Sequence, residues 1–183
     1  IERFHSVQNR IDQACLDAKR SPESVRLLAV SKTKPLEDIL VLAENGQICF
    51  GENYVQESLL KIAQSPELEW HFIGPIQSNK TKPIAEHFDW VHSVDRLKIA
   101  QRLSRQRPTN LAPLNILLEV NISDEPSKAG FTPQEVLEVA QEIANLPNLR
   151  LRGLMAIPQR AESFEEQRKP FALMRVLLNT LQQ

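Results

Sequence analysis

The sequence predicts an α/β protein whose parallel strands belong to a (β/α) barrel, and three observations lead to that class. Six short apolar segments, typical of buried strands, alternate with segments of helical periodicity. The strand–helix repeat is regular, which favours a closed barrel over an open sheet. The five glycines are scattered, so no GxGxxG motif supports dinucleotide binding in an open sheet.

The predicted elements follow one another along the whole chain. Residues 2 to about 20 form an extra N-terminal helix, because apolar side chains recur on one helical face. Gly46 ends the first helix after a strand, and Asp95 is placed to cap the helix after the fourth strand. The predicted strands cover residues 26–32, 48–53, 69–74, 90–94, 115–121 and 149–157. One helix follows each strand. The first runs from 35 to about 46, the second ends at about 64 and the third covers 78–87. The fourth ends at about 107, the fifth covers 133–145, and the last runs from about 163 to 183.

The number of strands is smaller than a complete barrel requires. Such a barrel has eight strands, whereas this sequence offers six and stops on a helix. Either the barrel is incomplete in this sequence or the fold is a smaller open sheet. We favour the first interpretation, in which residues 1–183 are a single barrel domain that is truncated at its C-terminus, with the last two strands missing. The natural polypeptide is expected to continue for roughly 35–45 residues, the length of two further βα units.

Composition narrows the range of partners. A net charge of −1, from 22 basic and 23 acidic residues, gives no field that would attract nucleic acid or anionic lipid. No long apolar span or signal-peptide pattern occurs, so no membrane partner is expected. Cys15 and Cys49 have no CxxC pairing, and two lone thiols suit a reducing cytoplasm.

Lys32 is the most informative residue of the chain. It ends the apolar segment 26–32. Leu28, Val30 and Lys32 are each two residues apart, so all three are predicted to point to one buried face of the strand. Parallel α/β folds place their chemistry at the carboxyl ends of strands. Burial there would favour the neutral amine, which attacks an aldehyde to form a Schiff base. Lys34 precedes a proline and is the weaker candidate, and a solvated lysine at a strand end remains an alternative.

The other strand ends carry weaker signals. Asn53 can either hydrogen-bond a ligand or cap the helix that follows it, and the cap is the commoner role. Met155 can fill the core or, at a barrel mouth, pack against a flat ring. His71 lies mid-strand, where a histidine is usually a satisfied core residue. His87 and His92 lack metal-ligand spacing and no Cys/His cluster exists, so no metal site is expected.

Four segments together carry a family resemblance. They are LAVSKTK (28–34), FGENYVQE (50–57), WHFIGPIQSNK (70–80) and RGLM (152–155), and they stand in order along the chain. The sequence resembles the pyridoxal phosphate homeostasis proteins, which are single-domain relatives of the alanine racemase N-terminal barrel. The resemblance covers essentially the whole chain. It implies a modified TIM barrel, completed in the family by two further strands that hold the cofactor phosphate and approach the pyridine nitrogen.

The resemblance also implies a function. Pyridoxal 5′-phosphate (PLP) is held as a Schiff base on Lys32, and Asn53 and Met155 match positions near the cofactor. The implied role is PLP homeostasis, and thereby amino-acid and keto-acid balance, without catalytic residues or turnover. A cytoplasmic monomer is expected, and PLP-dependent apo-enzymes are candidate recipients of the cofactor.

The alternative function is a PLP-dependent amino-acid racemase. Racemisation needs an acid/base group on each face of the substrate–cofactor adduct. In the racemases that resemble this barrel, a tyrosine from a second, β-rich domain supplies one of those groups. This chain has no such domain, and Tyr54 is its only tyrosine. A purely structural or partner-binding barrel is a third hypothesis, and the predicted burial of Lys32 at a strand end weakens it.

Overall fold

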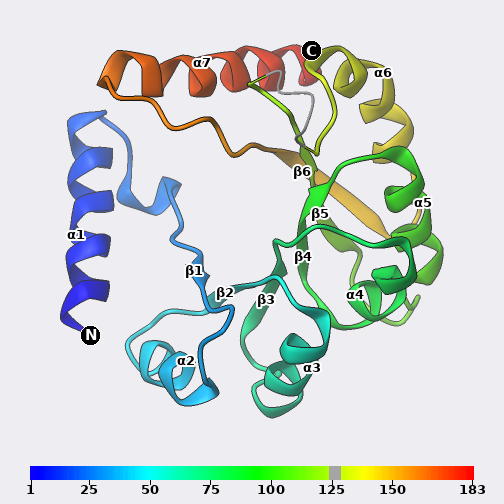
Figure 1. The fold of residues 1–183 in the computed structure, drawn as a ribbon, viewed down its shortest axis with the longest axis horizontal. Coiled ribbons are helices and arrows are strands. Elements are labelled where there is room, and N and C mark those ends of the chain that lie inside the picture. Colours follow the sequence, from blue (N-terminus) through cyan, green and yellow to red (C-terminus); the bar gives the residue numbers. More distant parts are fainter. Residues whose placement is uncertain (124–128) are drawn as a thin grey trace. The chain divides into compact units, whose positions relative to one another are not determined.

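The structure is a computed structural model that describes residues 1–123 and 129–183 (Figure 1). The described chain divides into two compact units, Ile1–Trp70 and His71–Gln183, and each is considered by itself. They are called the first and the second unit below. None of the described helices is long and apolar enough to cross a membrane.

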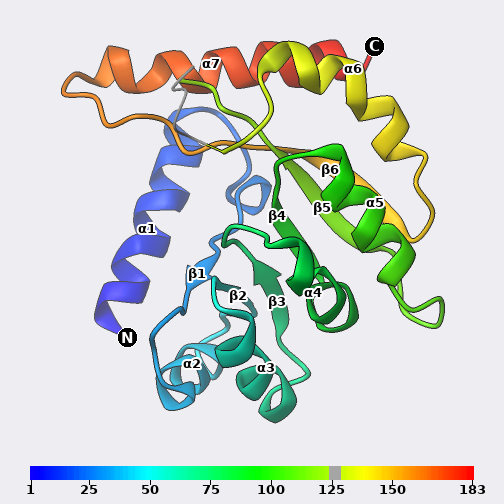
Figure 2. The same ribbon diagram turned by 45° about the vertical axis from the view of Figure 1, so that its right-hand side comes forward.

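The first unit begins with α1 (Glu2–Asp17), the predicted N-terminal helix, and a short 3₁₀ turn, η1 (Pro22–Ser24). Two βα pairs follow: β1 (Ala29–Val30) with α2 (Leu36–Ala43), and β2 (Cys49–Glu52) with α3 (Val55–Gln64) (Figure 2). β1 and β2 are parallel, with Ala29 opposite Phe50. The backbone N–H of Glu69, which starts β3 (Glu69–Phe72), donates to the Ile48 carbonyl at 2.9 Å.

The strand that precedes Lys32 is shorter than predicted, and its buried face is the opposite one. Only Ala29 and Val30 form β1. Val30 is 53% exposed and Lys32 is exposed, whereas Ser31 between them is buried. Alternation puts Val30 and Lys32 on one face, as predicted, but that face is the exposed one. The prediction that Lys32 is buried was therefore wrong.

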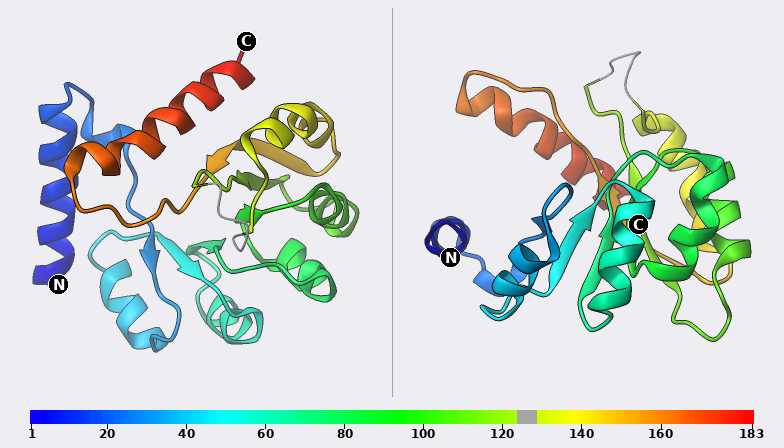
Figure 3. Two further views of the ribbon diagram at one scale, coloured as in Figure 1. Left: turned by 45° about the horizontal axis from the view of Figure 1, so that its top comes forward. Right: turned by 60° about the horizontal axis from the view of Figure 1, so that its bottom comes forward.

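The second unit starts with the end of β3 and continues through three further strands. These are β4 (Trp90–Val94), β5 (Leu114–Glu119) and β6 (Leu149–Met155), and each neighbouring pair from β3 to β6 is parallel. The helices are the 3₁₀ turn η2 (Ser78–Lys80), α4 (Thr81–His87), α5 (Leu97–Gln106), α6 (Pro133–Ala144) and α7 (Phe164–Leu181). Within this unit α4, α5 and α6 lie along the outer side of β4, β5 and β6 (Figure 3).

β5 shows how the parallel sheet of the second unit is held. Its six residues pair with β6 from Leu114 to Glu119. Leu114, Ile116 and Leu118 alternate along it and are each 0% exposed. Complete burial of such aliphatic side chains stabilises a domain by about 1.5–3 kcal/mol each.

The predicted helices and strands are confirmed in type and order, with differences at their ends. The cap predicted for α5 is wrong, because Asp95 pairs with the guanidinium of Arg96 at 2.7 Å and no side chain caps this helix. At α6 the cap comes from Thr132, whose hydroxyl accepts from the Glu135 backbone while the Glu135 side chain bonds back to Thr132. The loop predicted before α6 includes residues 124–128, which lie outside the described residues.

Candidate functional site

The chain turns sharply directly after β1, and the turn carries Lys32. The Ser31 N–H donates to the Gly51 carbonyl at 2.9 Å, which is the last ladder bond to β2. The Lys34 N–H then donates back to the Ser31 carbonyl at 3.0 Å, and Thr33 adopts a left-handed φ of 63°. A β-branched residue adopts this conformation only when its surroundings hold it there. Residues 31–34 are called the Lys32 turn below.

A buried polar cluster anchors this turn. Lys61, on α3, places its ammonium 3.0 Å from the Ser31 carbonyl, 2.8 Å from Glu52 Oε1 and 2.6 Å from Glu57 Oε1. The Lys61 side chain is 7% exposed and that of Glu52 is 0% exposed. The Ser31 hydroxyl also donates to Glu52 Oε1, at 2.6 Å. The four residues Ser31, Glu52, Glu57 and Lys61 are called the Lys61 cluster.

The cluster reaches both neighbours of Lys32 in the chain. Ser31, before it, is held by Glu52 and Lys61. Thr33, after it, donates its backbone N–H to Glu57 Oε1 at 2.9 Å. The Lys32 amine itself takes part in no hydrogen bond or ion pair with the described residues. The backbone of Lys32 is therefore fixed on both sides while its amine is free to react.

The charges of the cluster stabilise one another. Burial alone would lower the pKa of Lys61, but the hydrogen bonds that its ammonium donates to Glu52 and Glu57 outweigh burial and raise that pKa above its ordinary value. The hydrogen bond from Lys61 lowers the pKa of Glu57, and the Thr33 backbone N–H adds to that effect. At neutral pH Lys61 is thus a fixed cation in the cluster and Glu57 a carboxylate.

Two buried oxygens at the end of β2 have no hydrogen-bond partner among the described residues. They are Glu52 Oε2, inside the Lys61 cluster, and Asn53 Oδ1, one residue further along. Asn53 does not cap α3: the N-cap position belongs to Tyr54, and no side chain caps that helix. The cap reading of Asn53 is therefore wrong. A buried amide oxygen without a partner is costly unless a water molecule or a ligand supplies a donor.

Met155 is placed in the second unit, where it is the last residue of β6. Its carbonyl accepts from the Val120 N–H at 2.8 Å, and its side chain is half-buried. Glu119 ends β5 in the same unit, and burial, followed by repulsion from Asp95, raises the pKa of its carboxyl. The predicted strand over 149–157 is therefore confirmed, but it ends two residues earlier, at Met155. Lys32 and Asn53 follow the paired strands β1 and β2 of the first unit.

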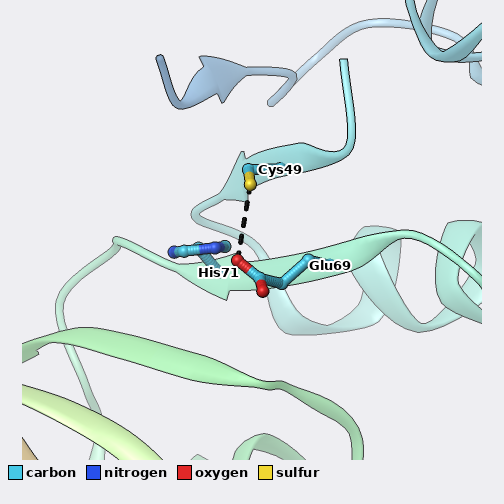
Figure 4. A group of neighbouring side chains, drawn as sticks. All are labelled: Cys49, Glu69 and His71. Carbon is cyan, nitrogen blue, oxygen red and sulfur yellow. Dashed lines mark hydrogen bonds between the residues drawn. The ribbon is translucent and has the colours of Figure 1, made fainter. Parts of the chain in front are cut away.

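His71, His92 and Cys49 have structural partners. His71 is buried, and its Nδ1 lies 2.8 Å from Nε2 of His92, which confirms that it is a satisfied core residue. The Cys49 thiol donates to Glu69 Oε1 at 3.4 Å (Figure 4). Burial and the nearby Glu69 carboxylate raise the pKa of Cys49 to about 11. This thiol therefore stays protonated at neutral pH, and a protonated thiol is a poor nucleophile.

None of the four members of the Lys61 cluster was predicted from the sequence to belong to a functional site. Glu57 and Lys61 are spaced i,i+4 on α3, a pattern that usually marks a solvated helix face. The one available signal was Glu52, an acidic residue inside the apolar segment 48–53, since a carboxylate is rarely buried without a partner.

Comparison with known proteins shows the family of the chain. Residues 8–183 match the family described as alanine racemase, N-terminal domain. The pyridoxal phosphate homeostasis protein of Haemophilus influenzae is 54% identical over 181 residues, which cover 97% of this chain and 76% of that protein. The Vibrio alginolyticus protein of the same name is 56% identical over 188 residues, covering 100% of this chain and 79% of the relative.

Solved structures of other proteins have a similar fold. PipY of Synechococcus elongatus PCC7942, solved with PLP bound, is 34% identical with a TM-score of 0.79, over 94% of this chain and 81% of PipY. Alanine racemase of Clostridium difficile 630 is 14% identical with a TM-score of 0.75, over 98% of this chain and 47% of the racemase, and shows a common fold alone.

These matches define an α/β protein of the alanine racemase N-terminal type, which confirms the predicted fold class. Within that class, the identity to the curated relatives is high and extends over nearly the whole chain. The chain belongs to the family of pyridoxal phosphate homeostasis proteins.

Proposed function

We propose that this protein binds PLP covalently through Lys32 and takes part in PLP homeostasis without catalytic turnover of its own. The observation that carries the proposal is the Lys32 turn: both neighbours of Lys32 are anchored by the Lys61 cluster, while its own amine is exposed and unpaired among the described residues. Family membership and PLP in the PipY structure support the choice of ligand.

The residues of the first unit fit an aldehyde cofactor. PLP supplies an aldehyde that a lysine amine can attack. The Lys32 amine, after losing one proton to solvent, forms a C–N bond to the aldehyde carbon, and the aldehyde oxygen leaves as water once it has taken up protons. Asn53 carries a buried oxygen that still lacks a donor, and we assign it to the ligand-binding set. Met155 is assigned there by resemblance alone.

The wider role follows from the same proposal. A protein that holds PLP reversibly can buffer the free aldehyde or deliver it to PLP-dependent apo-enzymes, which we propose as recipients. We further propose that residues 1–183 belong to one PLP-binding domain, supported by the family match over residues 8–183. A cytoplasmic monomer is the working assumption, consistent with two unpaired cysteines.

The test is covalent trapping of the cofactor. The protein is incubated with PLP, reduced with borohydride, digested and mapped by mass spectrometry, and its visible absorbance is recorded before reduction. We expect the pyridoxyl group on Lys32, loss of the label and of the visible band in Lys32→Ala, and retention of both in Lys34→Ala. A label found on Lys34 in the unaltered protein would refute the assignment of Lys32.

Racemase activity is measured on the same samples. The loaded protein is expected to show no interconversion of alanine or serine enantiomers above the background of free PLP, because Tyr54 is the only tyrosine of residues 1–183 that could act as a second acid/base group. Sustained racemisation that disappears in Lys32→Ala would assign the protein to the enzymes.

A further inference from the structure

We propose that Lys61 is a positioning residue for Lys32: it holds the Lys32 turn in the one conformation that presents the Lys32 amine for covalent attachment. This inference rests on the proposed PLP attachment but concerns different residues. Nothing in the family resemblance or in the names of the relatives assigns a role to Lys61 or to its two carboxylate partners.

The Lys61 ammonium lies at the carbonyl oxygen that closes the Lys32 turn. It bonds directly to the Ser31 carbonyl, at 3.0 Å, and this same carbonyl accepts the Lys34 N–H that closes the turn. A cation on this oxygen draws electron density toward it and fixes its orientation. The ammonium is held in turn by two carboxylates, at 2.8 and 2.6 Å, so it has little freedom to move.

The cluster also holds Thr33 in a strained backbone conformation. Thr33 has a φ of 63°, a conformation that a β-branched residue adopts only at a cost. Its N–H is bound by Glu57, and Lys61 fixes that carboxylate by sharing the same oxygen, Oε1. If Lys61 were absent, Glu57 would be free to leave Thr33, and the turn could relax to a more extended conformation.

An ordinary helix-surface pair differs from this cluster. Lys82 and Glu86 have the same i,i+4 spacing on α4, but their charged atoms are 3.8 Å apart and Lys82 is 68% exposed. The Lys61 cluster is buried and its ligands include the backbone on both sides of Lys32. Burial of a lysine at this place is explained by positioning rather than by solubility.

The test compares two variants with a matched control. Lys61→Met alone would leave the Glu52 carboxylate buried without a counter-charge, so the double variant Lys61→Met with Glu52→Gln removes both charges together. Glu57→Ala removes the acceptor of the Thr33 N–H and one of the two carboxylate partners of Lys61, and because the Glu57 side chain is 35% exposed this variant is expected to fold. Lys82→Met is the control, and thermal unfolding monitors the fold of every sample.

Two measurements are made on the full chain. The first is the ratio of pyridoxyl label on Lys32 to label on Lys34 at saturating PLP, which is expected to fall by about 10- to 100-fold in the double variant, and by less in Glu57→Ala, since a displaced reactive group can lose about that much. The second needs no cofactor: the backbone amides of Thr33 and Lys34 are expected to exchange with deuterium about tenfold faster or more. Lys82→Met should change neither.

The outcomes separate this inference from the proposed function. If the unaltered protein carries no label on Lys32, the proposed function fails, whatever the amide exchange shows. If it does carry the label, and a folded double variant keeps both the labelling ratio and the slow exchange of Thr33 and Lys34, Lys61 merely stabilises the fold and the inference is wrong. Faster exchange with an unchanged labelling ratio overturns it equally. Should the double variant not fold, the same criteria are applied to Glu57→Ala.

Discussion

The end of β1 and the middle of β5 both belong to parallel strands, but different interactions stabilise them. β5 pairs over six residues and buries three aliphatic side chains completely. β1 pairs over two residues, exposes Val30, and depends at its end on the charged Lys61 cluster. Apolar burial is insensitive to orientation, whereas hydrogen-bonded charges fix the direction of each group. Apolar burial holds β5, whereas hydrogen-bonded charges hold the turn that carries Lys32.

The largest expected effect tests whether the Lys61 cluster is a true buried network. Lys61→Met leaves Glu52, 0% exposed, without its cation, and removal of one partner of a buried pair costs about 3–5 kcal/mol. Urea unfolding at neutral pH measures the loss. The same substitution at Lys82 should change stability by less than about 0.5 kcal/mol. Equal, small losses at both positions would mean that the cluster is held as loosely as a surface pair.

The next effect tests the apolar side of the comparison. Leu118→Ala in β5 creates a cavity in a fully buried position and should cost about 2–5 kcal/mol in urea unfolding. Val30→Ala in β1 removes atoms from a side chain that is 53% exposed and should change stability by less than about 0.5 kcal/mol. A large loss at Val30 would show that its face is covered in solution, contrary to the exposed position described above.

The smallest expected effect is a pH dependence of the stability that the Lys61 cluster contributes, which β5 should not show. Lys61 has a raised pKa in the folded protein, so its contribution is complete below its ordinary value of 10.5 and is lost as pH rises through the raised value. Glu57 has a lowered pKa, so its contribution is present above its ordinary value of 4.5 and is lost as pH falls through the lowered value. The destabilisation caused by Lys61→Met should therefore shrink at both extremes.

The control for this pH series is Leu118→Ala, whose cost contains no titrating group and should stay constant over the same range. Both variants are compared with the unaltered protein at each pH, so that titration elsewhere in the chain cancels. A cost of Lys61→Met that does not vary with pH would contradict the ion-pair account of the cluster.

Much of the architecture could be predicted because it depends on local pattern. The helices and strands from α1 to α7 follow the apolar periodicity of the sequence, and the caps at Thr132 and Ser163 are local hydrogen bonds. The position of Lys32 at a strand end was likewise predicted from the segment that precedes it. One error arises where the local pattern leaves two partners open: Asp95 binds the neighbouring Arg96 in place of the helix end.

The sequence by itself determined the order of the βα units, the family, and the lysine that is the candidate for PLP attachment. Only the tertiary structure decided which face of β1 is buried and what holds the Lys32 turn. The physical reason is that alternation along a strand puts Val30 and Lys32 on the same face but does not say which face the rest of the fold covers. The turn is shaped by Glu52, Glu57 and Lys61, which lie 20 to 30 residues away in the chain and reach it only through the fold.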